Sequence, residues 1–262
     1  MNKRTKMILI IVAALLVAAV AVWLIFFNGE KEDSKNKLII GTEGVWSPYT
    51  YHDAKTDELM GFDIDVAKAV AEKLGMEAEF AQVDFDAVIA GVQSGRYTTG
   101  ANFIDVTEER AKTFTFSDPY AYGSTVLIVR ADNEDIHSFG DLNGRTTANS
   151  AGSTYMSYGE KFGAKVTGIP TLEETMVMVE SGRVDATINA SDAFTDYMQK
   201  MPDAQLKVVA QLPEKIPVAF PFKKDADPAL VEKVNNAIAE LRADGTLAAI
   251  SVKYFGYDIT QP

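Results

Sequence analysis

VQSGRYTTGANFID at residues 92–105 and VESGRVDATINASD at residues 179–192 are two related segments of this chain. One offset aligns the identical pairs Val92/Val179, Ser94/Ser181, Gly95/Gly182, Arg96/Arg183, Asn102/Asn189 and Asp105/Asp192. Each segment reads as a helix that ends at Ser-Gly-Arg, then a strand, then an asparagine and an acid at the end of that strand. Ligands of open α/β sheets bind beyond such strand ends. Two of them facing each other predict a cleft between two lobes.

Strand-like and helix-like stretches alternate on both sides of these segments. Residues 37–41 read as a strand, and Asp63 is expected to cap a helix that Gly75 ends. Such alternation on short connections predicts mainly parallel sheets. The β-branched run at 122–130 is expected to cross to the second lobe, and the chain is expected to return near residue 216.

The predicted fold is therefore α/β with two lobes, each a mainly parallel sheet flanked by helices, joined by two crossing strands. The second lobe is inserted into the first. The expected division is a cytoplasmic basic flank at 1–6, a transmembrane signal anchor at 7–27, a linker at 28–36, a first lobe at 37–123 and 217–258, and a second lobe at 124–216.

The anchor is predicted from an uninterrupted apolar run, Met7–Phe27, that follows the basic residues Lys3, Arg4 and Lys6. Spanning a bilayer takes about 20 apolar residues, whereas the apolar core of a cleaved signal has roughly 7–15. The basic flank stays in the cytoplasm, so the rest of the chain is expected outside. Because Ala19-Val-Ala21 imitates a cleavage site, a cleaved and secreted form stays open.

Composition excludes several classes of function. The chain has no cysteine, so it forms no disulfide. Its formal net charge of −12 at pH 7 argues against nucleic acid and anionic membrane surfaces as partners. His52 and His137 have no ligand-spaced companions, so neither a metal nor another cofactor is expected. A Gly-x-x-x-x-Gly-Lys motif and a Gly-x-Ser-x-Gly motif are both absent from the sequence.

Several motifs follow one another in a familiar order: IIGTE at 39–43, WSPY at 46–49, GFDIDVAKA at 61–69, DFD at 84–86, TEER at 107–110, FSDPY at 116–120, GST at 152–154 and GRVDA at 182–186. In these motifs residues 37–258 resemble the extracytoplasmic solute-binding protein of a polar-amino-acid ABC importer, bacterial solute-binding family 3. The stretches at 101–102, 147–150 and 185–189 are most similar to the cystine-binding branch. The resemblance implies a periplasmic-binding-protein-like fold.

The resemblance also implies ligand-binding roles. Arg110 matches the arginine that holds the ligand α-carboxylate, a role suited to the guanidinium fork. Ser153 and Thr154 match the pair at a helix N-terminus that takes the same carboxylate from the other lobe. The full set of candidate ligand-binding residues is Glu43, Trp46, Phe85, Asn102, Phe103, Asp105, Arg110, Ser153, Thr154, Asn189 and Asp192.

Structural interpretations stand beside these roles. Without the resemblance, Arg110 would be a solvated residue of a short helix. Trp46 and Phe85, which match the aromatics that sandwich a ligand side chain, could be core residues. Ser153 and Thr154 could be helix caps only. Glu43 lies where the family often has an acid that reads the ligand side chain, and the paired asparagines could be turn residues.

The chain departs from the family pattern at two positions. The amine-binding aspartate of the second lobe falls on Ala190, and a position that is often polar falls on Phe103. An ammonium group cannot be buried at acceptable cost without a counter-charge. Asp105 or Asp192 must therefore replace the missing aspartate, with Asp105 favoured, or the ligand is not a standard α-amino acid.

The expected function is the substrate-binding component of an amino-acid ABC importer. It binds a polar amino acid, cystine favoured, by hinge closure and is not an enzyme. The implied partners are a permease and its ATPase on separate chains, with this protein a monomer tethered to the membrane. Two alternatives stay open: a cyclohexadienyl-dehydratase-like enzyme on the same fold and a ligand-sensing domain.

Overall fold

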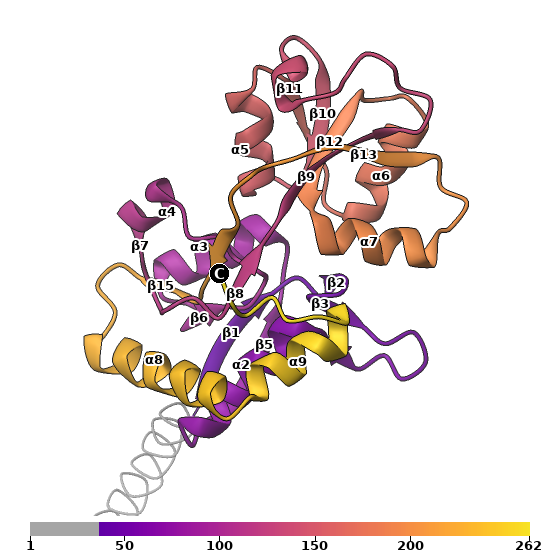
Figure 1. Cartoon of the computed structure of the whole chain (residues 1–262). Helices are drawn as coiled ribbons and strands as arrows, with labels where there is room; N and C mark the ends of the chain where they lie inside the picture. The colour runs from indigo at the N-terminus through magenta and orange to yellow at the C-terminus, as the bar shows by residue number, and fades with distance from the viewer. Residues whose placement is uncertain (1–36) are drawn as a thin grey trace, which may run out of the picture.

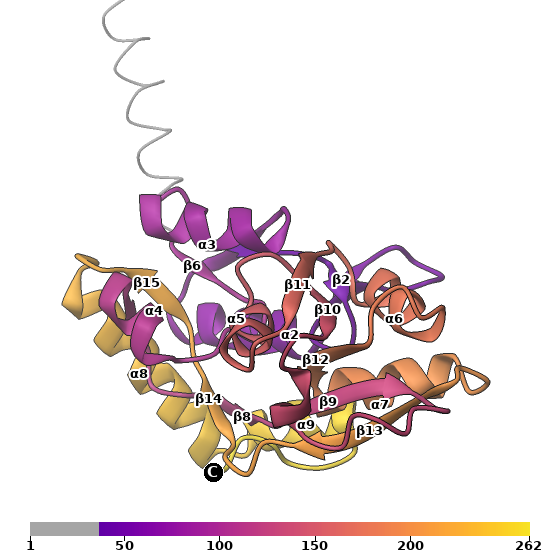
Figure 2. The same ribbon diagram turned by 90° about the horizontal axis from the view of Figure 1, so that it is seen from above.

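The computed structural model describes residues 37–262, and the chain forms two α/β lobes, seen one above the other in Figure 1 and from above in Figure 2. The sheet of the first lobe has the order β5 (Glu77–Gln82), β1 (Lys37–Thr42) and β6 (Thr99–Gly100), with every pair parallel. A small antiparallel sheet of β2 (Val45–Trp46), β3 (Thr50–His52) and β4 (Leu59–Met60) follows β1. The parallel sheet expected for this lobe is confirmed.

Helices of the first lobe begin and end close to their sequence signals. They are α2 (Phe62–Lys73), α3 (Phe85–Ser94), α4 (Glu108–Thr113), α8 (Pro228–Ala243) and α9 (Thr246–Phe255). Gly95 ends α3 in the left-handed conformation, and Asp227 caps α8 through its side chain. The short helix α9, between left-handed Gly245 and Gly256, was not predicted.

The second lobe is built on a five-stranded sheet of order β11 (Lys165–Gly168), β10 (Thr146–Asn149), β12 (Ala186–Ala190), β9 (Thr125–Arg130) and β13 (Leu206–Gln211). Its helices are α5 (Thr154–Lys161), α6 (Leu172–Glu180), α7 (Ser191–Lys200) and the 3-10 turn η1 (Phe139–Leu142). This sheet is mixed: β9 is antiparallel to both of its neighbours. Its other four strands run in one direction, so the sheet is mainly parallel as predicted, and the reversed strand β9 is the one that enters the lobe from the crossing segment.

Two chain segments join the lobes. Residues 122–130, predicted as one strand, form two, β8 (Ala121–Gly123) and β9, which Ser124 separates. On the return, β14 (Ile216–Val218) pairs with β8, and β15 (Pro221–Lys223) pairs with β7 (Phe114–Phe116). Figure 1 shows these connections between the two lobes. The break at Ser124 lies where the chain passes from the first lobe to the second.

Asp63 does not cap α2, in contrast to the prediction. Gly61 occupies the cap position, and the carboxylate of Asp63 is buried, where it accepts hydrogen bonds from Phe103 N and from the Tyr120 hydroxyl (3.0 Å). Burial raises the pKa of Asp63 to about 7. An aspartate predicted as a helix cap therefore lies in the core beneath the cleft.

The expected membrane anchor at 7–27 lies outside the described residues, as do the flank at 1–6 and the linker at 28–36. From residue 37 to residue 262, no helix is long and apolar enough to cross a membrane.

Candidate functional site

A cavity lies between the lobes, at the strand ends where the sequence predicts a cleft. It encloses about 560 Å³ of space, part of it continuous with solvent. Its walls are Glu43, Val45, Trp46, Phe85, Asn102, Phe103, Asp105, Arg110, Ser150, Ser153, Thr154, Tyr155, Pro170, Thr171, Leu172, Thr175 and Asn189. All the candidate residues except Asp192 are therefore brought together around one cavity.

Several residues of the wall were missed by sequence reasoning. The segment at 170–175 comes from the start of α6, where Thr171 caps the helix by accepting a hydrogen bond from Glu174 N. That capping motif predicts a helix start but carries no signal of a ligand. Tyr155 follows the Gly-Ser-Thr motif directly, and its ring meets Trp46 edge-on at 6.3 Å across the cleft. The cavity therefore has a larger apolar share than the candidate list implied.

Arg110 is positioned by the start of α4. Its backbone N–H donates to the side chain of Thr107, the cap residue, at 3.1 Å. Its guanidinium donates from Nη1 to the Asp105 carbonyl and from Nη2 to the Gly152 carbonyl of the other lobe, both at 3.2 Å. Burial lowers the pKa of Arg110, and Asp105 opposes that shift. The structure therefore places a largely desolvated guanidinium in the cavity wall, with one donor already reaching the opposite lobe.

Two carboxyl groups share the wall with Arg110. Burial raises the pKa of Asp105 to about 6, while Arg110 and the Thr154 hydroxyl lower it. Burial raises the pKa of Glu43 to about 7, with Asn102 lowering it. Carboxylates held in such surroundings are stabilised by a bound cation.

Asn102 holds Glu43 in place from two sides. Its Nδ2 donates to Glu43 Oε2 at 2.6 Å, and its Oδ1 accepts from Glu43 N at 2.8 Å. Asn102 is therefore a positioning residue for the acid as well as part of the wall. The repeat-related Asn189 also lines the cavity, and its Oδ1 accepts a hydrogen bond from Ala190 N at 2.9 Å.

Phe103 has a left-handed backbone, with φ at 48°. A bulky residue seldom adopts this conformation. Here the buried carboxylate of Asp63 accepts the Phe103 N–H, and the Phe103 ring stacks on Tyr49 with the centroids 4.0 Å apart. The core therefore holds an apolar ring in the wall at a position where the resemblance implies a polar residue.

Ser153 and Thr154 stand at the start of α5. Ser153 is the cap residue, and its Oγ accepts from Met156 N at 3.1 Å. The helix-cap interpretation is confirmed for Ser153. It is compatible with a ligand role, because the hydroxyl can still donate its own hydrogen towards the cavity.

Asp192 lies outside the cavity wall. It sits in the first turn of α7, and its carboxylate accepts a hydrogen bond from the hydroxyl of Tyr257. The matching residue of the first segment, Asp105, follows an irregular stretch and stays at the cleft. Asp105 and Asp192 therefore occupy matching positions in the two repeated segments, but only Asp105 lies in the cavity wall.

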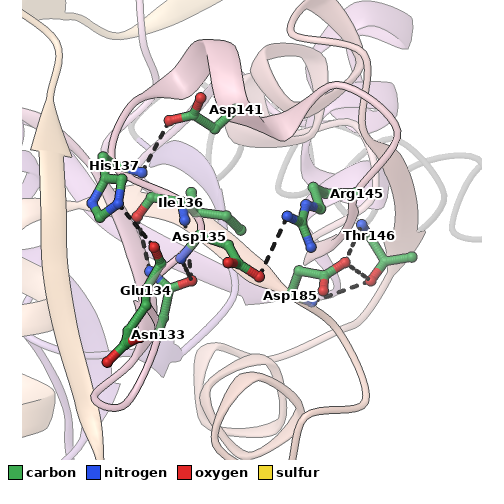
Figure 3. A network of polar contacts seen from close by, with 9 residues as sticks. All are labelled: Asn133, Glu134, Asp135, Ile136, His137, Asp141, Arg145, Thr146 and Asp185. Atoms are coloured by element: carbon green, nitrogen blue, oxygen red, sulfur yellow. Dashed lines mark hydrogen bonds and ion pairs between the residues drawn. The ribbon is translucent and has the colours of Figure 1, made fainter.

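Neither histidine belongs to the cavity. His52 contacts Asp57 O and Gln82 Oε1, each at 2.8 Å. His137 lies in the polar network of Figure 3, where its backbone N–H donates to Asp141 Oδ2 at 3.0 Å and its ring contacts Glu134 O at 3.0 Å. Among residues 37–262, no group of acids, histidines or cysteines is arranged to hold a metal ion.

We expect the ligand-free protein to become more stable as the pH falls from about 8 to about 6. The pKa of Glu43 is about 7 in the fold, and the same group titrates near 4.3 in an unfolded chain. The folded state thus binds more protons between these values, so the free energy of unfolding decreases as the pH rises through the window. Glu43→Gln removes one such group and should reduce the change in the free energy of unfolding between pH 8 and pH 6 by about 1 kcal/mol.

The matched control for this pH dependence is Glu77→Gln, at an exposed position of β5. It should keep the slope of the unmodified chain. A Glu43→Gln slope equal to that of the control would contradict the assignment of a raised pKa to Glu43.

Comparison with known proteins agrees with this geometry. The sequence profile of the bacterial extracellular solute-binding proteins, family 3, matches residues 38–257. The chain belongs to this family. Membership places the protein outside the cytoplasm and assigns it to the solute-binding proteins of amino-acid ABC transporters.

Two relatives illustrate the family. A probable amino-acid ABC transporter-binding protein of Haemophilus influenzae is 39% identical over 256 residues, which cover 97% of this chain and 99% of the relative. The L-cystine-binding protein TcyA of Bacillus subtilis is 36% identical over 227 residues, covering 87% of this chain and 84% of the relative. The resemblance stated from the sequence is confirmed at the level of the family.

Solved structures share the two-lobed fold. An ancestral arginine-binding protein bound to arginine has a TM-score of 0.79 at 35% identity, over 84% of this chain and 99% of that one. The unliganded, open L-cystine receptor of Neisseria gonorrhoeae has a TM-score of 0.57 at 37% identity, over 89% and 98%. The overall shape is therefore nearer to the ligand-bound structure than to the open one.

One further structure bears on the enzyme alternative. An ancestral amino-acid-binding protein, AncCDT-1, described as a precursor of cyclohexadienyl dehydratase, has a TM-score of 0.75 at 31% identity, over 86% of this chain and 98% of that one.

Proposed function

We propose that this protein binds a polar amino acid, L-cystine by preference, in the interlobe cavity and delivers it unchanged to a membrane permease. The observation that carries the proposal is one largely desolvated guanidinium, Arg110, in the same wall as two carboxyl groups, Asp105 and Glu43. This arrangement is complementary to an α-amino acid that carries a carboxylate and an ammonium group at one end and a second cationic group at the other.

Each group has a part in this proposal. Arg110 takes the α-carboxylate with its fork, together with the hydroxyls of Ser153 and Thr154 at the start of α5. Asp105 takes the α-ammonium in place of the acid that is missing at Ala190. Trp46 and Phe85 contact the ligand side chain, and Phe103 and Asn189 complete the wall.

Glu43 distinguishes ligands in this proposal. L-cystine carries a second ammonium group, which stands beside its second carboxylate, whereas the side chain of L-glutamine carries no charge. The similarity to TcyA, an L-cystine-binding protein, favours L-cystine. The similarity to an arginine-binding structure makes L-arginine, with its distal guanidinium, the rival ligand.

We expect Glu43→Gln to weaken binding of L-cystine at least about tenfold, because a buried ammonium loses its charged partner. Binding of L-glutamine should change less than about threefold, since that side chain has no charge to pair. Calorimetric titration of both ligands checks this difference. Equal losses of affinity for the two ligands would show that Glu43 does not recognise the ligand side chain.

The domain division, the membrane tether and the partners are proposed from the sequence analysis. We propose 37–123 and 217–258 as the first lobe and 124–216 as the second, with the protein a monomer that residues 7–27 tether to the membrane. The permease and ATPase are separate chains. A role as a ligand-sensing domain would replace these partners with a signalling protein, and it is distinguished by whether binding protein, permease and ATPase together import the ligand.

An enzyme on this fold is the second candidate, and the similarity to AncCDT-1 is the observation that favours it. Acids such as Glu43 and Asp105 could exchange protons with a bound substrate. Mass spectrometry of the ligand recovered after incubation with the protein separates the two functions. Unchanged L-cystine, with prephenate neither bound nor converted, is the result that binding predicts; conversion of prephenate would replace the binding function by an enzymatic one.

A further inference from the structure

Helix α7 of the second lobe touches the first lobe at both of its ends. Near its N-terminus, the carboxylate of Asp192 accepts the hydrogen bond from the Tyr257 hydroxyl. At its C-terminus, Lys200 Nζ donates to Ser47 Oγ at 2.6 Å and lies 5.2 Å from the centroid of the Tyr51 ring. Figure 1 shows α7 on the side of its lobe that faces α9 and β3.

The C-terminal segment that carries Tyr257 is fixed to the first lobe. The Ile259 carbonyl accepts from Tyr122 N of the crossing strand β8 at 2.8 Å. The hydroxyl of Ser251, in α9, donates to Tyr257 O at 2.7 Å and accepts from Ile259 N at 2.9 Å. The Tyr257–Asp192 contact therefore links the second lobe to a firmly attached part of the first.

These contacts are separate from the ligand cavity. Asp192, Tyr257, Lys200, Ser47 and Tyr51 are not among the residues of its wall. The contact between Arg110 and Gly152, in contrast, uses a donor that a ligand carboxylate would compete for. A ligand that enters the cavity therefore leaves both α7 contacts intact, whereas separation of the lobes breaks them.

Burial supports an energetic role for the acid. Asp192 is 7% exposed, and burial raises the pKa of its carboxyl group, while the Tyr257 hydroxyl lowers it. Tyr257 itself is 54% exposed, so its ring contributes little to the core. What Tyr257 offers the fold is its hydroxyl, directed at a carboxylate of the other lobe.

We infer that Asp192–Tyr257 and Lys200–Ser47 form a two-point latch that holds the lobes closed whether or not the cavity is occupied. The latch sets ligand affinity from outside the binding site, and in this respect the inference rests on the proposed function. Apparent affinity scales with the fraction of molecules in the binding-competent state. Loss of the latch therefore weakens binding without removing a ligand contact.

Single-molecule energy transfer on the full chain in detergent tests the latch. The chain has no cysteine, so Glu72→Cys on α2 and Glu173→Cys on α6, both at exposed positions, accept dyes on opposite lobes without side reactions. Tyr257→Phe removes only a hydroxyl, and Lys200→Met removes the ammonium group, which also pairs with Asp196 of the same helix at 2.7 Å. Tyr97→Phe, in the core of the first lobe, and exposed Lys68→Met on α2 are the matched controls.

We expect Tyr257→Phe and Lys200→Met each to lower the closed fraction, and to speed dissociation of L-cystine about three- to tenfold. The double variant should exceed either single one. A lower closed fraction, with or without L-cystine, supports the latch. Closed fractions and dissociation rates equal to those of the two controls overturn it. If no amino acid binds the unmodified chain, the proposed function fails, while the ligand-free closed fractions still decide the latch.

Discussion

Arg110→Ala should remove amino-acid binding while leaving the fold intact. Truncating one partner of a buried, hydrogen-bonded charge pair costs about 2–5 kcal/mol, which is at least about thirtyfold in affinity. The loss should be the same for every amino acid, because all share the α-carboxylate. The helix that carries Arg110 has no buried residue, so thermal stability should change little. Calorimetric titration together with thermal unfolding measures both quantities.

The control for Arg110→Ala is Arg183→Ala, because Arg183 is the exposed arginine of the second repeat segment. It should bind ligand as the unmodified chain does. Retained affinity in a folded Arg110→Ala protein would contradict the assignment of the α-carboxylate to Arg110.

Asp105→Asn should produce the second large loss, again at least about thirtyfold, because the ligand ammonium would be buried without a counter-charge. The substitution keeps the shape of the side chain and the carbonyl that accepts from Arg110 Nη1. The preference for an amino acid over its amine-free analogue should disappear at the same time. Titration of each ligand pair against the variant and the unmodified chain measures this preference.

Asp192→Asn separates the two candidate acids. It should weaken binding by less than about tenfold, through the latch, and should leave the preference for the amine unchanged. If Asp192→Asn abolishes the preference and Asp105→Asn does not, the ligand ammonium would instead be assigned to Asp192 in the second lobe.

Much of the fold could be predicted from the sequence, because local signals decide where helices start and where strands end, whereas the ligand-binding roles were implied by the family resemblance. Arg110 follows a cap at Thr107, and Ser153 caps the helix whose first residue is Thr154; all but Thr107 line the cavity. Where a strand end or a helix start lies at the cleft, the local motif that predicts the end of the element also contains the residues that line the cavity.

Asp192 shows where that reasoning stops. Its segment matches that of Asp105, yet strand β12 runs directly into α7, whereas β6 is followed by an irregular stretch before α4. One acid therefore enters a helix and faces Tyr257, and the other stays at the cleft. Tyr257 lies 65 residues further along the chain, so no local pattern could link it to Asp192.

The buried position of Asp63 and the reversed direction of β9 were not predicted, for a related reason. An aspartate near a helix start is typical of a cap, but this carboxylate meets Phe103 N and the Tyr120 hydroxyl, which only the folded core brings together. The direction of β9 depends on the path of the chain between lobes and not on its own β-branched composition. Tertiary contacts decide both.

The central claim is that this chain binds an amino acid at Arg110 and does not alter it. Thermal unfolding against L-cystine, L-arginine, L-glutamine and prephenate tests it most directly. A ligand at about one hundred times its dissociation constant stabilises the fold by roughly 2.7 kcal/mol. We predict a selective shift with an amino acid, L-cystine first, that Arg110→Ala abolishes. No shift with any amino acid, together with a shift or turnover for prephenate, would contradict the account.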